Sequence, residues 1–478
     1  MRTTTLFLSL FSIILICFSC TDNMEEPDLP DPKESENSFL DEIGKTDLAA
    51  FIIDTKNAVI PNEPKVPADF KIIENGAEIF SGRMGIELRG STSRRLFEKK
   101  SYGFETWDEN NEDVNVELLG FPEEEDWILQ GPYADKTLLR NVLIYNLSNQ
   151  MDFYAARTQL VEVALNEEYM GVYAFMEKLK RDKARIDVKK LEEEDVDEEK
   201  ITGGYILKID KTSGDNEVDD WAGDALYTEE MSFRSDYNPN GQKIDYAPFG
   251  EKRGEETYFL YEYPDFEDLN TAQKQYIQTY IQEFEEALLN DDFSGDLPRK
   301  YMEYIDIESF AKFFILNELS ANPDAYRLST YLNKQRGEKL KMGPIWDFNL
   351  AFGLDGRSAT SVWIYEYNKR YPNDLWLIHF WWTQLLEDPM FKAEIKKQWQ
   401  DYRAGVLSNA NINRVIQEQQ TLLEKNNAIE RNFKRWEVLG VALPFNDFVG
   451  KDYEEESNYL KDWIVDRMAW MDGEIMSW

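Results

Sequence analysis

The chain has 478 residues, of which 92 are acidic and 53 are lysine or arginine, so its formal net charge is −39. A surface this acidic repels nucleic acid and anionic membranes, and we expect neither as a partner. The 13 Trp, 25 Tyr and 28 Phe residues are ample material for a large core. The length allows either one bilobed domain or two domains.

The N-terminus has the layout of a secretory signal. Arg2 supplies the positive start, residues 6–18 form an apolar run too short to span a bilayer comfortably, and Ser19 precedes Cys20. We predict a signal peptide over residues 1–19 and a lipidated Cys20, with an ordinary signal peptide or a buried N-terminal helix as the alternatives. The protein is then a bacterial lipoprotein, anchored to the membrane through Cys20.

The segment after the predicted lipidation site is rich in Asp, Glu and Pro and poor in apolar residues. Such a segment cannot bury enough surface to fold, so we expect a disordered tether over residues 20–47 and a fold that begins near Leu48. Acidic residues soon after Cys20 are compatible with an outer-membrane or cell-surface address. We therefore expect an extracytoplasmic lipoprotein of the cell envelope.

Removal of the signal peptide limits the chemistry that is left. Cys17 leaves with the signal and Cys20 carries lipid, so the mature chain has no free thiol and no disulfide. His379 is the only histidine, and its aromatic neighbours favour a satisfied core residue over a member of a catalytic triad. The usual zinc, haem, iron–sulfur and cysteine-nucleophile sites are excluded, which leaves carboxylates with hard metal ions.

The first part of the chain has a β-strand pattern. Residues 51–105 contain short alternating apolar runs that are broken by Asn, Gly and Pro. Asp135 is placed to cap an amphipathic helix, because leucine and valine recur at helical spacing over residues 138–147. Residues 159–177 then predict two strands joined by a tight turn at 166–169.

The middle of the chain is polar. Residues 189–200 are strongly acidic and are expected to form a solvated loop. Residues 203–210 predict a strand after a glycine pair. Residues 211–265 are polar with scattered aromatics, and we interpret them as an irregular insertion.

The second half is helical by its apolar spacing and its capping residues. The predicted helices cover residues 270–290, 306–319, 391–407, 412–433 and 459–478. The fold class is therefore α+β, with a β-rich lobe over 48–265, a helical lobe over 266–478 and a cleft between them. No repeat of solenoid period is present.

Two carboxylates carry the most informative pattern. Asp324 comes just after a helix that Pro323 ends, which places it on a loop. Asp347 follows a short apolar strand, and residues 328–346 read as a hairpin between the two carboxylates. This topology brings both to one end of the hairpin. Phosphoryl transfer uses such a pair, one to orient an attacking hydroxyl and one to hold magnesium on the phosphates.

Several segments together resemble the CotH family of atypical, spore-coat-type protein kinases, from about residue 50 to residue 355. They are Arg89-Gly-Ser-Thr-Ser-Arg94, Lys99-Lys-Ser-Tyr102, Asp126-Trp-Ile-Leu129, Asp135-Lys-Thr-Leu-Leu-Arg-Asn141, Asn166-Glu-Glu-Tyr-Met-Gly-Val-Tyr173, Glu177-Lys178, Gly203-Gly-Tyr205 and Gly343-Pro-Ile-Trp-Asp-Phe348. The resemblance implies a divergent, bilobed protein-kinase-like fold that transfers phosphate from ATP to a protein hydroxyl with Mg²⁺. The acceptor protein is not indicated.

The resemblance also assigns roles to residues. Asp324 corresponds to the catalytic aspartate of the family, and Asp347 to the metal-binding aspartate of its Asp-Phe-Asp motif. The nucleotide-binding residues implied in the first lobe are Arg89, Ser91, Arg94, Lys100, Arg140 and Glu177. Lys100 would reach the α- and β-phosphates, or it would lie at a lobe edge with only its stem buried. Arg140 has the alternative of an ordinary ion-paired helix arginine.

Two positions of the predicted metal site depart from the family pattern. Ser329 stands five residues after Asp324, where kinases place a metal-binding asparagine. Asn349 stands where the family often has an aspartate. With Asp347 these residues form the implied metal ligands, and serine is a poorer magnesium ligand than an amide or a carboxylate. One metal site is therefore expected to be weak.

Two other functions stay open from the sequence. The first is a non-catalytic surface lipoprotein that uses a kinase-like scaffold to bind protein or glycan. It draws on the two departures and on a set of tryptophans for which core packing is the competing explanation: Trp363, Trp376, Trp381 and Trp382. The second is a glycosidase with two carboxylates, which only the presence of carboxylates supports.

Overall fold

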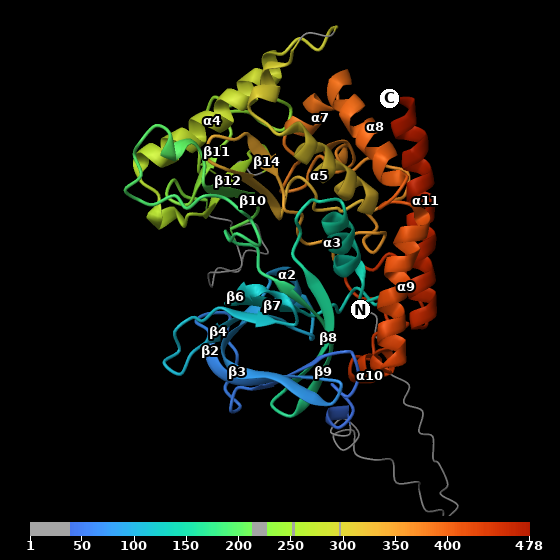
Figure 1. Ribbon diagram of the computed structural model, residues 1–478. Helices are drawn as coiled ribbons and strands as arrows, with labels where there is room; N and C mark the ends of the chain where they lie inside the picture. The colour runs from blue at the N-terminus through green and yellow to red at the C-terminus, as the bar shows by residue number, and fades with distance from the viewer. Residues whose placement is uncertain (1–38, 213–226, 251–253, 296–297) are drawn as a thin grey trace, which may run out of the picture.

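Strands of the N-terminal half close into a barrel. The computed structural model describes residues 39–212, 227–250, 254–295 and 298–478. The barrel order is β1-β2-β3-β4-β7-β9-β8, and β1 closes the ring because it pairs antiparallel with β2 and parallel with β8. Figure 1 shows this barrel below the rest of the molecule. Its strands are β1 (Ala50–Asp54), β2 (Val66–Glu74), β3 (Ala77–Arg89), β4 (Ser101–Trp107), β7 (Asp126–Gln130), β8 (Thr158–Leu165) and β9 (Glu168–Glu177).

Aromatic side chains fill the barrel. Phe51, Phe104 and Phe175 contact one another there, with ring centroids 5.2 to 6.4 Å apart. Each comes from an alternating strand that turns its apolar side inward. The β8–β9 hairpin turns at Asn166 and Glu167, which both have positive φ, as expected for a two-residue turn of this kind. Short elements accompany the barrel: α2 (Thr92–Leu96), β5 (Val116–Leu118) and β6 (Phe121–Glu124).

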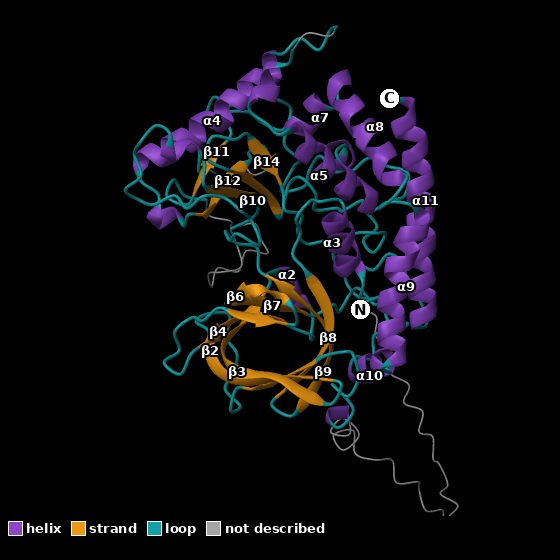
Figure 2. Cartoon of the chain, in the orientation of Figure 1, coloured by secondary structure: helices purple, strands orange, loops and turns teal. Residues whose placement is uncertain are grey.

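The second lobe contains its own antiparallel sheet. The order is β11-β12-β10-β13-β14, with β10 in the centre. These strands are β10 (Tyr205–Ile209), β11 (Ser232–Arg234), β12 (Tyr258–Tyr263), β13 (Thr330–Lys334) and β14 (Leu340–Met342). Figure 2 shows this sheet surrounded by helices and separate from the barrel.

Helices make up the rest of the second lobe, and α3, which lies in the chain between the barrel strands β7 and β8, packs against helices of this lobe. Asn270, Asp306 and Asp452 cap the N-termini of α4, α5 and α11 with their side chains. None of the helices in the described part of the chain combines the length and apolar character that a membrane crossing requires. The helices are α3 (Arg140–Gln150), α4 (Thr271–Asn290), α5 (Ile307–Ser320), α6 (Tyr367–Arg370), α7 (Trp381–Leu385), α8 (Pro389–Arg403), α9 (Asn409–Lys425), α10 (Ala428–Arg435) and α11 (Tyr453–Ser477).

The C-terminal helices return to the barrel through α10. Arg431 on α10 makes a two-pronged ion pair with the buried Glu162 of β8, with both N···O distances at 2.9 Å. Asn432 accepts hydrogen bonds from the Val172 N–H and from Lys99. The barrel is therefore held to the second lobe by polar contacts that lie far apart in sequence.

The expected α+β class, with a β-rich N-terminal lobe and a largely helical C-terminal lobe, is confirmed. The lobe boundary at residue 265 is wrong, because β10, β11 and β12 pair with β13 and β14. For the same reason residues 211–265 are more than an irregular insertion, since they supply two strands of the second sheet. The packed fold also begins before Leu48: Phe39 and Ile43 are buried against Tyr169, within the stretch that we expected to be tether. Residues 1–38, with the predicted signal peptide and Cys20, lie outside the described residues.

Two helix boundaries also differ from expectation. The helix predicted after Asp135 begins only at Arg140, because the Asp135 carboxylate accepts a hydrogen bond from the Arg140 N–H and holds the preceding residues in a turn. The helix predicted over residues 412–433 is two helices. Asn427 has a φ of 52° and separates α9 from α10.

The lone histidine and most of the tryptophans belong to the core. His379 is 1% exposed and its Nε2 lies 2.8 Å from Glu285 Oε1, which confirms the expectation of a core residue. Trp363, Trp381 and Trp382 are buried and pack against other aromatic rings. They form no exposed platform for a glycan.

A buried ion pair joins α5 to α11. Glu318 and Arg467 are both fully buried, and Arg467 Nη2 lies 3.1 Å from Glu318 Oε2. The Glu318 carboxylate also accepts from the Ile364 and Tyr365 N–H groups and from the Tyr326 hydroxyl. Every oxygen of the buried carboxylate therefore has partners, as a buried charge requires.

We expect Glu318→Ala to lower the free energy of unfolding by roughly 3 to 5 kcal/mol, because it leaves Arg467 buried without its counter-charge. Glu430→Ala is the matched control, since Glu430 forms an exposed pair with Lys434 and such pairs contribute about 0 to 1 kcal/mol. Urea denaturation of both variants measures the difference. Equal midpoints for the two variants would contradict the role given to Glu318.

Candidate active site

A cleft of about 950 Å³ lies between the barrel and the second lobe. The barrel contributes Arg89 and Lys178 to its lining, and the second lobe contributes Asp210, Asp324 and Asp347. Acidic and basic side chains line it in equal number, although the whole chain is strongly acidic. The cleft is therefore suited to a ligand that carries negative charge and binds through a cation.

Asp324 lies on the loop after α5, as predicted. Ala321 ends the helix in the left-handed conformation, and the Asn322 side chain accepts a hydrogen bond from the Asp324 N–H at 3.2 Å. Arg327 is almost fully buried and donates from Nη2 to Asp324 Oδ1 at 2.9 Å. It also donates to Asp374 at 3.2 Å. The ion pair with Arg327 fixes one carboxylate oxygen of Asp324, and Asp324 lines the cleft.

Side chains of α3 hold the backbone at Asp347 in place. The Tyr145 hydroxyl accepts the Asp347 N–H at 2.9 Å, and the Asn141 side chain accepts the Phe348 N–H at 2.8 Å. Asp347 has a φ of 59°, a conformation that a non-glycine residue adopts at some cost. The surrounding contacts therefore determine the direction of this aspartate.

Asp324 and Asp347 line the same cleft, and the charge of Asp324 acts on Asp347. Burial, followed by the charges of Asp324 and Asp210, raises the pKa of Asp347 to about 7. Lys211 and Arg89 act in the opposite direction. Three carboxylates thus face a common space, in which a bound cation would relieve their repulsion.

Asp210 is the functional candidate that the sequence pattern missed. It follows β10 and lines the cleft, and burial raises its pKa while Lys208 opposes the rise. Its Oδ2 lies 3.4 Å from the Ser329 hydroxyl. An aspartate at the end of a buried strand was a usable signal, but the pairing partner of that strand was not evident from the sequence.

The first predicted nucleotide-binding segment does enter the cleft. Arg89 and Ser91 line it, and the Arg89 guanidinium lies 5.9 Å from the ring centroid of Trp346, next to Asp347. Gly90 between them has a φ of 96°, and a Cβ there would lie 2.5 Å from the Ser93 hydroxyl. Only glycine fits this bend without displacement.

The other predicted nucleotide ligands do not line the cleft. Lys100 donates to the carbonyl oxygens of Arg94 and Phe97, at the end of α2. Arg140 pairs with Asp135 and donates to the Ala351 carbonyl oxygen, and Glu177 pairs with Arg157. Arg94 contributes its backbone to Lys100. The side chains of Lys100, Arg140 and Glu177 therefore have structural partners away from the cleft lining.

Ser329 and Asn349 both line the cleft, as Asp347 does. The oxygen donors in this lining are carboxylate, amide and hydroxyl groups, which are the types that bind Mg²⁺. The donor set therefore fits the metal that the family pattern implies.

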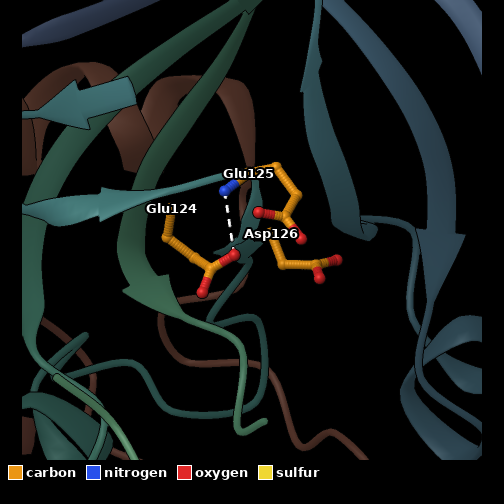
Figure 3. A group of neighbouring side chains, drawn as sticks. All are labelled: Glu124, Glu125 and Asp126. Atoms are coloured by element: carbon orange, nitrogen blue, oxygen red, sulfur yellow. Dashed lines mark hydrogen bonds between the residues drawn. The ribbon is translucent and has the colours of Figure 1, made fainter. Parts of the chain in front are cut away.

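A different acidic cluster is already neutralised. Figure 3 shows Glu124, Glu125 and Asp126, with the Glu125 N–H donating to the Glu124 carboxylate at 3.0 Å. In the described part of the chain they are the one group of three carboxylates with oxygens within 4.8 Å of one another. Lys180 lies among them, with contacts of 3.0, 2.6 and 2.8 Å, and Lys178 also contacts Asp126. Although burial opposes it, these lysines lower the pKa of Asp126 to about 2. We assign no metal there.

Comparison with known proteins shows the family of this chain. The model of the CotH kinase protein family matches residues 86–471, which include Asp210, Asp324 and Asp347. The chain belongs to the CotH kinase family. Among solved structures, this CotH chain is similar to the proinflammatory kinase CtkA of Helicobacter pylori, with a TM-score of 0.30 and 10% identity over 78% of this chain and 94% of that one. No curated protein sequence matches it.

The raised pKa of Asp347 predicts a pH-dependent stability. A carboxyl with a raised folded-state pKa stabilises the fold while protonated, and this contribution is lost as the pH rises from about 4 through about 7. We therefore expect Asp347→Asn to be more stable than the wild type at pH 8 by roughly 1 to 3 kcal/mol, and similar to it at pH 4.

Urea denaturation with EDTA present, at pH 4 and at pH 8, measures this difference. Asp401→Asn is the matched control, because Asp401 is an exposed residue of α8. A stability gain at pH 8 that is no larger for Asp347→Asn than for Asp401→Asn would contradict the prediction.

Proposed function

We propose that this CotH kinase family member transfers the γ-phosphate of ATP to a serine or threonine hydroxyl of a protein, with Mg²⁺. The observation that carries the proposal is the convergence of Asp324 and Asp347 on one cleft, where the charge of Asp324 acts on Asp347. Phosphoryl transfer needs this combination, since catalysis there is mainly positioning and charge stabilisation.

Asp324 takes the part of the residue that orients the acceptor. Arg327 holds one of its oxygens, and the other is available to accept the proton of an incoming hydroxyl. Because Arg327 is itself held by Asp374 and by the Pro323 carbonyl oxygen, the direction of the Asp324 carboxylate is set before the acceptor binds. Such preorganisation lowers the cost of reaching the reactive geometry.

Asp347 takes the part of the metal ligand, with Ser329 and Asn349 in the same lining. Bound Mg²⁺ would neutralise charge on the phosphates. Arg89, steadied over Trp346, and Lys211 are the cations of this chain that act electrostatically on Asp347, and they would bind phosphate oxygens. The nucleotide-steadying role expected for Lys100 passes to these two residues.

The full-length chain, incubated with γ-labelled ATP, Mg²⁺ and casein, tests the proposal. We expect label in casein or in the chain itself, and at least about a hundredfold less label with Asp324→Ala or with Asp347→Ala. Asp401→Asn, on the surface of α8, is expected to label as the wild type does.

Label retained in both cleft variants would contradict the proposed site. No label in the wild type, together with no thermal shift by ATP and Mg²⁺, would favour the non-catalytic scaffold instead.

We also propose that the protein acts outside the cytoplasm as a lipoprotein of the cell envelope, with Cys20 as the lipidated residue. The apolar run before Ser19 and Cys20 supports this. An anchored enzyme of this type would meet its acceptor proteins at the membrane surface.

Expression of the full chain with labelled palmitate tests the anchor. We expect the wild type to carry label and to fractionate with membranes, and Cys20→Ser to lose the label. Cys17→Ser is the control, because the predicted cleavage removes Cys17, and it should keep both properties. Label on Cys20→Ser would exclude Cys20 as the lipidated residue.

A further inference from the structure

Asp210 lies directly opposite the position at which this chain lacks the usual metal-binding asparagine. Strand β10 pairs antiparallel with β13, and Ile209 is the partner of Thr330. The next residues along the two strands, Asp210 and Ser329, are therefore neighbours across the sheet. Their side chains meet, since the Ser329 hydroxyl lies 3.4 Å from Asp210 Oδ2.

Ser329 has a small side chain, and the carboxylate of Asp210 lies against it. Protein kinases place an asparagine five residues after the catalytic aspartate, and its amide oxygen binds the second Mg²⁺. Serine at position 329 cannot reach as far, but the carboxylate that lies against its hydroxyl comes from the adjacent strand. The oxygen ligand missing from one strand is thus present on its neighbour.

The charge of Asp210 has no ion-pair partner in the described part of the chain. The nearest strand lysine, Lys208, contacts Glu262 at 2.9 Å instead. The Asp210 carboxylate accepts from the Lys211 N–H at 2.9 Å and from the hydroxyl and backbone of Ser329, which leaves at least one of its four lone pairs without a donor. The charges of Lys208 and Lys211 offset the burial of Asp210 only in part, and the charge of Asp210 acts unfavourably on that of Asp347.

We propose that Asp210 is a metal ligand of this site and takes the place of the asparagine that is absent from position 329. The metal is a divalent cation that enters with ATP. The inference rests on the proposed function, since it concerns the metal that accompanies the nucleotide. Among the described residues, Asp210, Asp324 and Asp347 do not form a group with oxygens all within 4.8 Å of one another, as the Glu124 cluster does. Mg²⁺ is commonly bound in this way, by one or two carboxylates together with substrate phosphates.

A titration of the full-length chain with Mn²⁺ tests the assignment. The electron paramagnetic resonance signal of the free ion measures how much Mn²⁺ is bound. The titration is made with a non-hydrolysable ATP analogue present. We expect Asp210→Asn to bind Mn²⁺ at least tenfold more weakly than the wild type, because a neutral amide replaces a charged ligand. Asp401→Asn is the matched control, and its affinity should be unchanged.

A wild-type affinity in Asp210→Asn would overturn the assignment and leave the proposed function intact. A wild type that binds neither Mn²⁺ nor the nucleotide analogue would overturn the proposed function, and this inference with it. The two failures are therefore distinguishable in one experiment.

A second measurement uses the unaltered chain and does not depend on the folding of a variant. Fe²⁺ replaces Mg²⁺ in many oxygen-ligand sites, and with ascorbate and peroxide it generates radicals that cut the backbone near its ligands. We expect nucleotide-dependent cuts near residue 210 as well as near residue 347. Cuts near residue 347 without any near residue 210 would overturn the assignment.

Discussion

The ion pair between Glu318 and Arg467 is the contact on which the loop that carries Asp324 depends. Burial raises the pKa of Glu318, so the carboxylate would be costly in this position without the guanidinium beside it. Its remaining hydrogen bonds join α5 to the segment at Ile364 and Tyr365, and to Tyr326 two residues after Asp324. The loop that carries Asp324 is thus bound at its base by a network in which each charge has its partner.

The other carboxylate loop is held by α3, the helix that connects the lobes. Asn141 and Tyr145 fix the backbone at Asp347 and Phe348, while Arg140 binds the carbonyl oxygen of Ala351 farther along. The Arg140 guanidinium is therefore occupied by Asp135 and by this carbonyl oxygen. A helix that contacts both lobes and supports the segment around Asp347 couples the position of Asp347 to the packing between them.

Charge in the cleft differs from charge on the rest of the protein. The overall excess of acidic residues repels anions, whereas the cleft sets Arg89, Lys208 and Lys211 among its carboxylates. These basic side chains would favour an anionic ligand in a molecule that is otherwise strongly acidic. Lys178 and Lys180 are less available, because Asp126 and its neighbours already hold them.

The sequence alone was sufficient to predict that Asp324, Asp347 and Arg89 belong to one site, and to predict the general α+β class. Pro323 ends a helix, and a short hairpin follows it, so the two aspartates are brought together by local chain geometry within 23 residues. Capping residues such as Asp306 likewise act on their own helix, and the start of α5 followed from them.

Tertiary structure decided the residues whose partners are distant in sequence. Asp210 meets Ser329 across 119 residues and Arg140 meets Ala351 across 211, so their roles depended on which strands and lobes pack together. The same holds for the strands within residues 211–265, which pair with β13 and β14. Lys100 is a different case, because its partners are carbonyl oxygens close in sequence that are brought to it by the fold of α2. Local spacing predicts which residues can act, whereas the long-range pairing of backbone and charge determines where they point.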